Sequence, residues 1–198
     1  MDWEKQTLDF YDSNTDEFVT GTLAADMGEA RERFLALVLP GGRILDFGCG
    51  SGRDTRAFLE AGYVVDAVDG SEEICRKASE VTGIPVRKML FSELDAQCMY
   101  DGIWACASIL HLPQRELAEV LRKAEAALKP GGTLYASFKY GEYEGFRNGR
   151  YFTDFTEETL QAFWKDASSL RILDLWVSRD VRTDRKERQW TNLLAGKG

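Results

Sequence analysis

One short stretch of the sequence concentrates residues that can bring main-chain groups against a ligand. The stretch ILDFGCGSGRDTRAF places Gly48, Gly50 and Gly52 between an apolar run and an amphipathic segment. Glycine allows a tight turn and a close backbone approach, so the amide groups of such a turn can bind a ligand directly. Carboxylates stand at Asp46, before the turn, and at Asp69, after the next apolar run. An acid in the second position can accept hydrogen bonds from both ribose hydroxyls of a nucleoside.

Three familiar ligand-binding patterns fail at this turn. The dinucleotide fingerprint needs a small residue where Arg53 stands, which argues against a nicotinamide oxidoreductase. No Gly-Lys-Ser or Gly-Lys-Thr follows, as a P-loop requires, and the G-x-S-x-G elbow of hydrolases is absent around Ser51. The pattern that remains is D-x-G-x-G-x-G, starting at Asp46.

The surrounding chain alternates between short apolar runs and helical patterns. The apolar runs are GGRILDF, GYVVDAVD, IPVRKML, YDGIWACA and GGTLYASFK, and the helical patterns are GRDTRAFLEA, SEEICRKASEV and QRELAEVLRKAEAALKP. This alternation predicts βαβ units with a parallel sheet. The glycine turn then lies at the carboxyl end of the first strand, where ligands bind in open α/β sheets. The segment FSELDAQCM is too short for a helix assignment and is left unassigned.

The two ends of the chain complete the predicted architecture. Residues 25–40 carry apolar residues at helical spacing and stop at Pro40. After the fifth run, YGEYEGFRNGRYFTDF is predicted as a long loop, and Thr156 as the N-cap of a helix. The segments LRILDLWVSRDV and ERQWTNLLA predict two strands around the polar turn RTDRK. We therefore expect a Rossmann-like α/β fold, a seven-stranded mostly parallel sheet flanked by helices, with a C-terminal antiparallel hairpin.

Composition excludes several classes of partner and site. The net charge is -8 and the pI about 4.9, so neither nucleic acid nor a membrane surface is expected as a partner. The basic stretch from Arg179 to Arg188 is interrupted by Asp180, Asp184 and Glu187, which favours an exposed hairpin over an RNA contact. One histidine and four cysteines without C-x-x-C spacing predict no metal site. The polar N-terminus and the lack of a long apolar run predict a cytoplasmic protein.

The motifs resemble those of the class I S-adenosylmethionine-dependent methyltransferases. The resemblance rests on LDFGCGSG, VDGS, YDGIWACASILHLP and ALKPGGTLYASF in this order, and it covers roughly residues 44–139. The predicted order of elements is similar to that of small stand-alone family members of the type 11/12 and tellurite-resistance-like kinds. In the last motif, Pro130 is expected to end a helix and Gly131-Gly132 to form a turn.

The resemblance implies S-adenosylmethionine as cofactor, S-adenosylhomocysteine as product, and a set of binding positions. It implies that Asp46 and the backbone at Gly48 hold the methionine amino group and that Asp69 binds ribose. It also implies that Gly70 and Ser71 border the adenosine. Ser71 suits the N-cap of a helix as well, and the two roles are compatible. Leu90 and Phe91 stand where the family often has an acid, which implies apolar and backbone recognition of adenine. The expected cofactor-binding residues are Asp46, Gly48, Cys49, Gly50, Gly52, Arg53, Asp69, Gly70, Ser71, Leu90, Phe91, Ala105 and Cys106.

Methyl transfer from a sulfonium is an in-line displacement, so the protein must chiefly align donor and acceptor. His111 is a candidate base or a packed core histidine, and Tyr11 is a candidate lid residue or an aromatic on a helix face. Arg53 is a candidate partner of the cofactor carboxylate or a solvated residue. The loop residues Lys139, Tyr140, Arg147 and Arg150 suit an anionic small molecule, although many such loops are merely solvated.

These observations predict a single methyltransferase domain over residues 1–198. Its expected parts are a helical lid (1–40), a cofactor-binding core (41–139), and a substrate-side loop, helix and terminal hairpin (140–198). The expected function is methyl transfer to a small-molecule acceptor; the alternative is a non-catalytic S-adenosylmethionine-binding regulatory or interaction protein. The absence of an N-P-P-Y tetrapeptide argues against amide or base nitrogen acceptors. The acceptor atom and the oligomeric state are left open.

Overall fold

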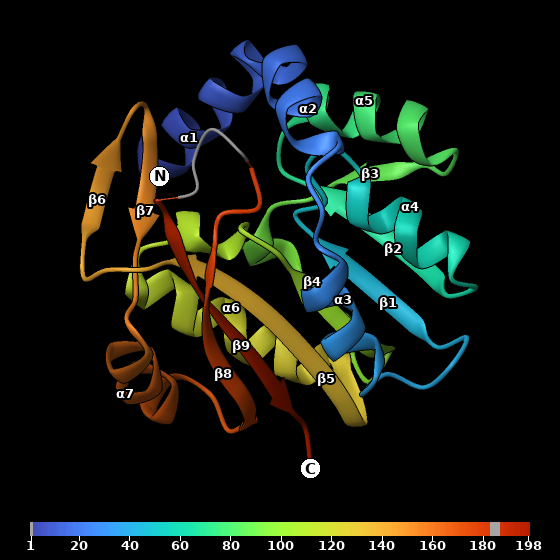
Figure 1. Ribbon diagram of the computed structural model, residues 1–198, viewed down its shortest axis with the longest axis vertical. Coiled ribbons are helices and arrows are strands. Elements are labelled where there is room, and N and C mark those ends of the chain that lie inside the picture. The colour runs from blue at the N-terminus through green and yellow to red at the C-terminus, as the bar shows by residue number, and fades with distance from the viewer. Residues whose placement is uncertain (1, 183–186) are drawn as a thin grey trace.

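Helices and strands alternate through the centre of the chain as the sequence predicts. The computed structural model describes residues 2–182 and 187–198 (Figure 1). In chain order its elements are α1 (Asp2–Ser13), α2 (Thr15–Leu23), α3 (Gly28–Leu35), β1 (Arg43–Phe47), α4 (Arg53–Glu60), β2 (Val64–Asp69), α5 (Glu72–Thr82), β3 (Val86–Lys88), the 3₁₀ helix η1 (Phe91–Glu93), β4 (Tyr100–Ala105), the 3₁₀ helix η2 (Ile109–His111), α6 (Gln114–Ala127), β5 (Leu128–Lys139), β6 (Glu144–Arg147), β7 (Arg150–Thr153), α7 (Glu157–Ala167), β8 (Arg171–Arg179) and β9 (Gln189–Gly196).

The main sheet has seven strands in the order β3-β2-β1-β4-β5-β9-β8. The first five pair in parallel, and β9 runs antiparallel to both β5 and β8. The predicted sheet with its terminal antiparallel hairpin is therefore confirmed. Residues 183–186 of the predicted turn, Asp184 among them, lie outside the described residues.

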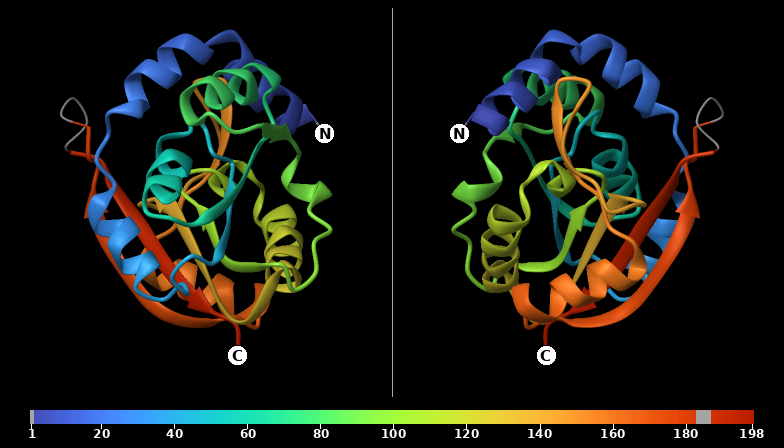
Figure 2. Two further views of the ribbon diagram at one scale, coloured as in Figure 1. Left: turned by 90° about the vertical axis from the view of Figure 1, so that its right-hand side faces the viewer. Right: turned by 90° about the vertical axis from the view of Figure 1, so that its left-hand side faces the viewer.

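Helices cover both faces of the sheet, which explains why its strands are apolar runs rather than alternating patterns (Figure 2). On one face α3 and α4 pack over β1, β4 and β5, while α5 covers β2 and β3. On the other face α6 and α7 bury the larger part of the core. Every residue of β4 is buried, and Ile44 and Leu45 of β1 have no exposed surface.

An aromatic cluster fixes the first of these faces. The rings of Trp104 and Tyr135, on the neighbouring strands β4 and β5, stack with centroids 3.9 Å apart. Phe34 of α3 and Phe58 of α4 pack on Trp104 with centroid distances of 5.2 and 5.5 Å. The cluster holds α3 and α4 to the centre of the sheet, directly below the glycine turn.

Two local predictions need correction. The segment predicted as a loop after β5 contains the hairpin β6–β7, which turns at Asn148 and Gly149 with φ of 49° and 78°. Positive φ at both central residues is the geometry that an Asn-Gly pair favours in two-residue hairpins. The helix before the fifth strand ends at Ala127, ahead of Pro130, because Leu128 already pairs with Tyr100 of β4.

The first two helices lie over the carboxyl ends of the parallel strands (Figure 1). On one side, the Tyr151 amide of β7 donates to Thr7 Oγ1 of α1 at 3.1 Å. On the other, Ser71 donates to Asp12 of α1 at 2.5 Å. Within the segment expected as a lid, α1 and α2 thus cover this edge, while α3 packs on the face of the sheet.

Candidate functional site

The glycine turn after β1 forms a tight cradle at the carboxyl edge of the sheet. The amides of Gly48 and Cys49 both donate to the carbonyl of Val68, at 3.0 and 2.9 Å, which ties the turn to the end of β2. Gly48 has φ of 86°, and a Cβ there would lie 2.4 Å from the Cβ of Ser108. Glycine is therefore required at position 48 by both conformation and space.

The other two glycines have different tasks. The amide of Gly50 donates to Asp69 at 3.1 Å, so the turn faces that carboxylate. Gly52 has φ of 75°, and a Cβ there would lie 2.7 Å from a methyl carbon of Thr82 in α5. Gly52 therefore permits the close approach of α4 and α5, and it does not itself line the cavity described below.

Asp69 is a half-buried carboxylate at the end of β2 that faces a cavity. Its two oxygens accept hydrogen bonds from the amides of Ser71 and Gly50, at 3.0 and 3.1 Å. Burial raises the pKa of this carboxyl, while the amide hydrogen bonds act in the opposite direction. Ser71 itself caps α5 by accepting from the Ile74 amide at 3.1 Å, which confirms the predicted capping role.

Asp46 lies in β1, just before the turn, and its surroundings favour the protonated, neutral form of its carboxyl group. It is 2% exposed and accepts a hydrogen bond from Thr55 Oγ1 at 2.5 Å. Burial, and then the neighbouring charge of Asp54, raises the pKa of Asp46 to about 7. A cation placed beside this carboxyl would stabilise its charged form and reverse the shift.

Arg53 is anchored at the wall by its neighbour. Its guanidinium donates to both carboxylate oxygens of Asp54, at 3.1 and 2.5 Å, and lies 3.7 Å from the sulfur of Cys106. Asp54 also accepts from Arg31 at 2.8 Å and from the Trp104 indole at 3.0 Å. Although burial acts to raise it, the pKa of Asp54 is lowered by the two arginines.

The imidazole of His111 has both nitrogens engaged. Nδ1 lies 2.6 Å from the Tyr151 carbonyl and Nε2 lies 2.8 Å from the Tyr11 hydroxyl. A carbonyl can only accept, so the ring proton is on Nδ1 and the Tyr11 hydroxyl donates to Nε2. Burial, helped by the charges of Arg150 and Lys139, lowers the pKa of His111 to about 3, so the ring is neutral at physiological pH.

Two cations complete the wall next to His111. Lys139, at the end of β5, places its Nζ 3.8 Å from the centroid of the Phe152 ring. Arg150, at the start of β7, stacks on Phe10 with 4.2 Å between its guanidinium carbon and the ring centroid. Burial and the charges of Arg147 and Arg150 lower the pKa of Lys139 to about 8.

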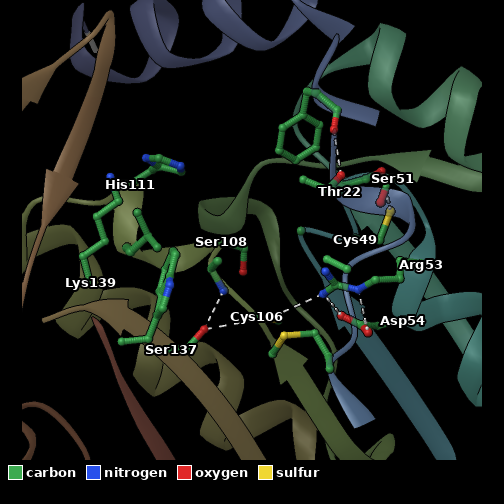
Figure 3. Close-up of a pocket in the computed structure, with 18 of the residues that line it drawn as sticks. Thr22, Cys49, Ser51, Arg53, Asp54, Cys106, Ser108, His111, Ser137 and Lys139 are labelled. Atoms are coloured by element: carbon green, nitrogen blue, oxygen red, sulfur yellow. Dashed lines mark hydrogen bonds and ion pairs between the residues drawn. The ribbon is translucent and has the colours of Figure 1, made fainter. Parts of the chain in front are cut away.

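These groups surround one cavity of about 580 Å³, within the size range of small-molecule sites. Figure 3 shows Arg53 with Asp54 on one side, His111 with Lys139 on the opposite side, and Ser108 and Cys106 between them. Of the residues predicted from sequence, the wall contains Tyr11, Asp46, Gly48, Cys49, Gly50, Arg53, Asp69, Gly70, Leu90, Phe91, Cys106, His111, Lys139 and Arg150.

Five predicted residues lie outside the described wall: Gly52, Ser71, Ala105, Tyr140 and Arg147. Ala105 is buried in the core below the site, and Tyr140 is 43% exposed. Arg147 forms an ion pair with the buried Asp154, at 2.5 Å.

Sequence reasoning also missed parts of the wall. Phe18 of α2 stands over Gly50, whose Cβ would lie 3.2 Å from that ring. Phe152 comes from the unpredicted hairpin. Trp176 and Trp190 come from β8 and β9, so the described part of the terminal hairpin faces the cavity rather than only solvent. The Asn-Gly pair was a usable signal for β6–β7, whereas nothing local marked Phe18.

Within residues 2–182 and 187–198, no group of three histidine, cysteine or acidic side chains is placed to hold a metal ion. Over the same ranges, every helix is too short or too polar to cross a bilayer.

Comparison with known proteins agrees with this geometry. Residues 44–132 match the family described as "Methyltransferase domain". A ubiquinone biosynthesis O-methyltransferase of Xanthomonas campestris is 30% identical over 108 residues, which are 51% of this chain and 44% of that protein. An N-terminal Xaa-Pro-Lys N-methyltransferase of Rattus norvegicus is 35% identical over 98 residues, 46% of this chain and 44% of that protein. The chain thus spans less than half the length of these curated relatives.

A solved structure extends the likeness to nearly the whole chain. It is the 1,6-didemethyltoxoflavin-N1-methyltransferase of Burkholderia thailandensis, with bound 1,6-didemethyltoxoflavin and S-adenosylhomocysteine. The match has a TM-score of 0.80 and 25% identity, and it covers 99% of this chain and 89% of the other.

Proposed function

Because residues 44–132 form a class I S-adenosylmethionine-dependent methyltransferase domain whose cofactor is S-adenosylmethionine, we propose that this protein methylates a small molecule in the cavity at the carboxyl edge of its sheet. The observation that carries the proposal is the arrangement of Asp69. This half-buried carboxylate is oriented by the amides of Gly50 and Ser71 and lies in the same cavity as His111 and Lys139.

The residues at the glycine turn fit the cofactor that we assign to them. Gly48 has no side chain, so its backbone can approach a ligand closely. The pKa of Asp46 is raised, so a positively charged group of a ligand would stabilise its carboxylate form. We assign Asp46 and the Gly48 backbone to the methionine amino group and Asp69 to the ribose hydroxyls. Leu90 and Phe91, beside Met89, supply an apolar wall for adenine.

The cofactor, when bound, supplies a methyl group on a positively charged sulfur. The protein's own task is then to exclude water and align the acceptor, because in-line displacement requires geometry before it requires a base. α1 and α2 close the cavity above the turn. We infer that His111, neutral and bonded at both nitrogens, orients the hydroxyl of Tyr11 rather than accepting a proton from the acceptor.

The cavity limits the size of the acceptor. The relatives do not agree on the kind of atom that receives the methyl group. The relatives include a ubiquinone biosynthesis O-methyltransferase, an N-terminal Xaa-Pro-Lys N-methyltransferase and a 1,6-didemethyltoxoflavin-N1-methyltransferase. A cavity of about 580 Å³ that must also hold the cofactor supports a small molecule or a narrow chain end. We propose a small molecule.

Ligand-induced shifts in melting temperature test the proposal. S-adenosylmethionine and S-adenosylhomocysteine at about 100 times their dissociation constants should stabilise the protein by about 2.7 kcal/mol, several degrees for a domain of this size. NAD should give no shift. Asp69→Ala should abolish the adenosyl shifts, whereas Asp66→Ala, on the same strand but paired with Arg43, should retain them.

Two results would contradict the proposal. A shift with NAD and none with the adenosyl ligands would remove the cofactor assignment. Binding of S-adenosylmethionine without turnover against any acceptor in a broad metabolite screen would instead support the alternative, a binding protein that transfers nothing.

A further inference from the structure

The acceptor side of the cavity carries positive charge that the described residues do not neutralise. Lys139 and Arg150 both approach the Phe152 ring, with Nζ and the guanidinium carbon 3.8 and 5.3 Å from its centroid. Within residues 2–182 and 187–198, no carboxylate lies at ion-pair distance from either side chain. Arg188 adds a further positive charge that faces Lys139.

The nearby carboxylates are already paired with other arginines. Asp154 accepts twice from Arg147, at 2.5 and 2.6 Å. Asp180, which lines the same cavity, is bound by Arg182 at 2.7 Å. Each of these acids therefore has its own cation, and the excess charge at Lys139 remains.

Arg150 also has few hydrogen-bond acceptors among the described residues. Its Nε is buried without a partner, and its one polar contact within residues 2–182 and 187–198 is a long hydrogen bond of 3.4 Å to the Tyr11 hydroxyl. That hydroxyl donates its own proton to His111, so it offers Arg150 an oxygen but no charge. A guanidinium group has five N–H donors, and among the described residues one donor nitrogen of Arg150 has an acceptor.

An unpaired cation inside a protein is costly, and partial stacking on aromatic rings returns a fraction of that cost. Burial and the surrounding arginines already lower the pKa of Lys139 to about 8. A ligand with a negative group would supply the partner that the fold omits. The Phe152 ring beside both cations is 2% exposed, so a ligand would contact the cations themselves rather than that ring.

We propose that the methyl acceptor is an anion, whose carboxylate or comparable acidic group binds at Lys139 and Arg150. This inference rests on the proposed function and narrows the class of its substrate. The anionic group is the binding handle, and the atom that receives the methyl group lies elsewhere on the same molecule.

Matched pairs of aromatic probes test the inference. Benzoate with benzamide, and 2-naphthoate with 2-naphthamide, differ in charge but hardly in shape. Each probe is titrated by calorimetry into protein saturated with S-adenosylhomocysteine. The proteins compared are the wild type, Lys139→Met, Arg150→Met, and the control Lys165→Met, which removes an equal charge from the exposed side of α7.

We expect each carboxylate to bind at least about tenfold more tightly than its amide, as for a charge-assisted contact. The preference should disappear in Lys139→Met and in Arg150→Met and persist in Lys165→Met. The melting temperature without ligand gives a second readout. Because Lys139→Met removes an uncompensated charge, it should leave that temperature unchanged or raise it.

Equal affinity for the two members of each pair, or no measurable binding of either carboxylate, would overturn the inference. A fall in the melting temperature of Lys139→Met with the carboxylate preference intact would also overturn it, since Lys139 would then have a structural role. The proposed function is judged separately, by binding of S-adenosylhomocysteine, which all four proteins should retain.

Discussion

Acidification should destabilise this protein through His111, and the size of the effect follows from the site. The ring is 8% exposed, and its pKa falls from 6.5 to about 3 on folding. One unit of pKa corresponds to about 1.4 kcal/mol, so the full shift is worth roughly 5 kcal/mol. That is a large part of the stability of an ordinary domain, which is about 5–15 kcal/mol.

The sign follows from proton uptake. Below pH 6.5 His111 is protonated in the unfolded chain but stays neutral in the folded protein. The free energy of unfolding therefore falls as the pH decreases. The loss continues until the pH reaches the folded pKa of about 3. Above pH 6.5 the contribution does not change with pH.

Urea unfolding of the wild type and His111→Asn, followed by circular dichroism from pH 7.5 to pH 4.5 in steps of about one unit, measures this effect. The asparagine amide can still donate to the Tyr151 carbonyl, and the acidic groups common to both proteins cancel in the difference. The wild type should lose about 1.4 kcal/mol per pH unit relative to the variant below pH 6.5.

An independent measurement uses the fact that the chain contains one histidine. The ring-proton resonance of untagged protein reports its titration directly. Tyr11→Phe serves as a companion variant, because loss of the hydroxyl that donates to Nε2 should move the pKa back upward. A resonance that titrates near 6.5 in the wild type, or a stability difference that does not change with pH, would refute the reasoning.

Two further predictions concern the glycine turn. The affinity for S-adenosylhomocysteine should rise by up to about tenfold per pH unit as the pH increases toward 7 and level off above it, because the ammonium group of the ligand pairs with the charged form of Asp46. Calorimetry checks this, and Asp46→Asn should remove the dependence. Gly48→Ala should destabilise the protein more than Gly62→Ala and abolish the ligand-induced shift in melting temperature. Both glycines have φ of 86°, but a Cβ at 48 would meet Ser108 at 2.4 Å while one at 62 would meet nothing within 4 Å. Equal losses would refute the steric argument.

Much of the architecture was predictable because its signals are local. Apolar runs such as RILDF mark strands covered on both faces, and the glycines at the end of that run mark the ligand edge. The Asn-Gly pair at 148–149 was equally local, but without assigning it a hairpin turn the prediction left Phe152 in a loop. The sequence contained the signal for this hairpin, but the turn preference of the Asn-Gly pair was not used.

The rest of the site depends on contacts between distant segments, which a single sequence does not reveal. Tyr11 and His111 are one hundred positions apart, and their hydrogen bond exists because α1 crosses the sheet edge. Arg53 was expected as a partner of the cofactor carboxylate, and its pairing with the adjacent Asp54 was not part of that prediction. Trp190 reaches the cavity because β9 pairs with β5, a register fixed by tertiary packing.

The position of β9 has a consequence for the order in which the protein is built. β9 lies between β5 and β8, so Leu134 pairs with Ala195 across about sixty residues of chain. Such distant pairing slows folding, since a large loop must close before the contact is made. During synthesis β5 leaves the ribosome with an open edge, exposing hydrogen-bonding groups to other chains. Until residues 189–196 emerge, the edge of β5 that pairs with β9 stays open, and strands of other chains can add to it.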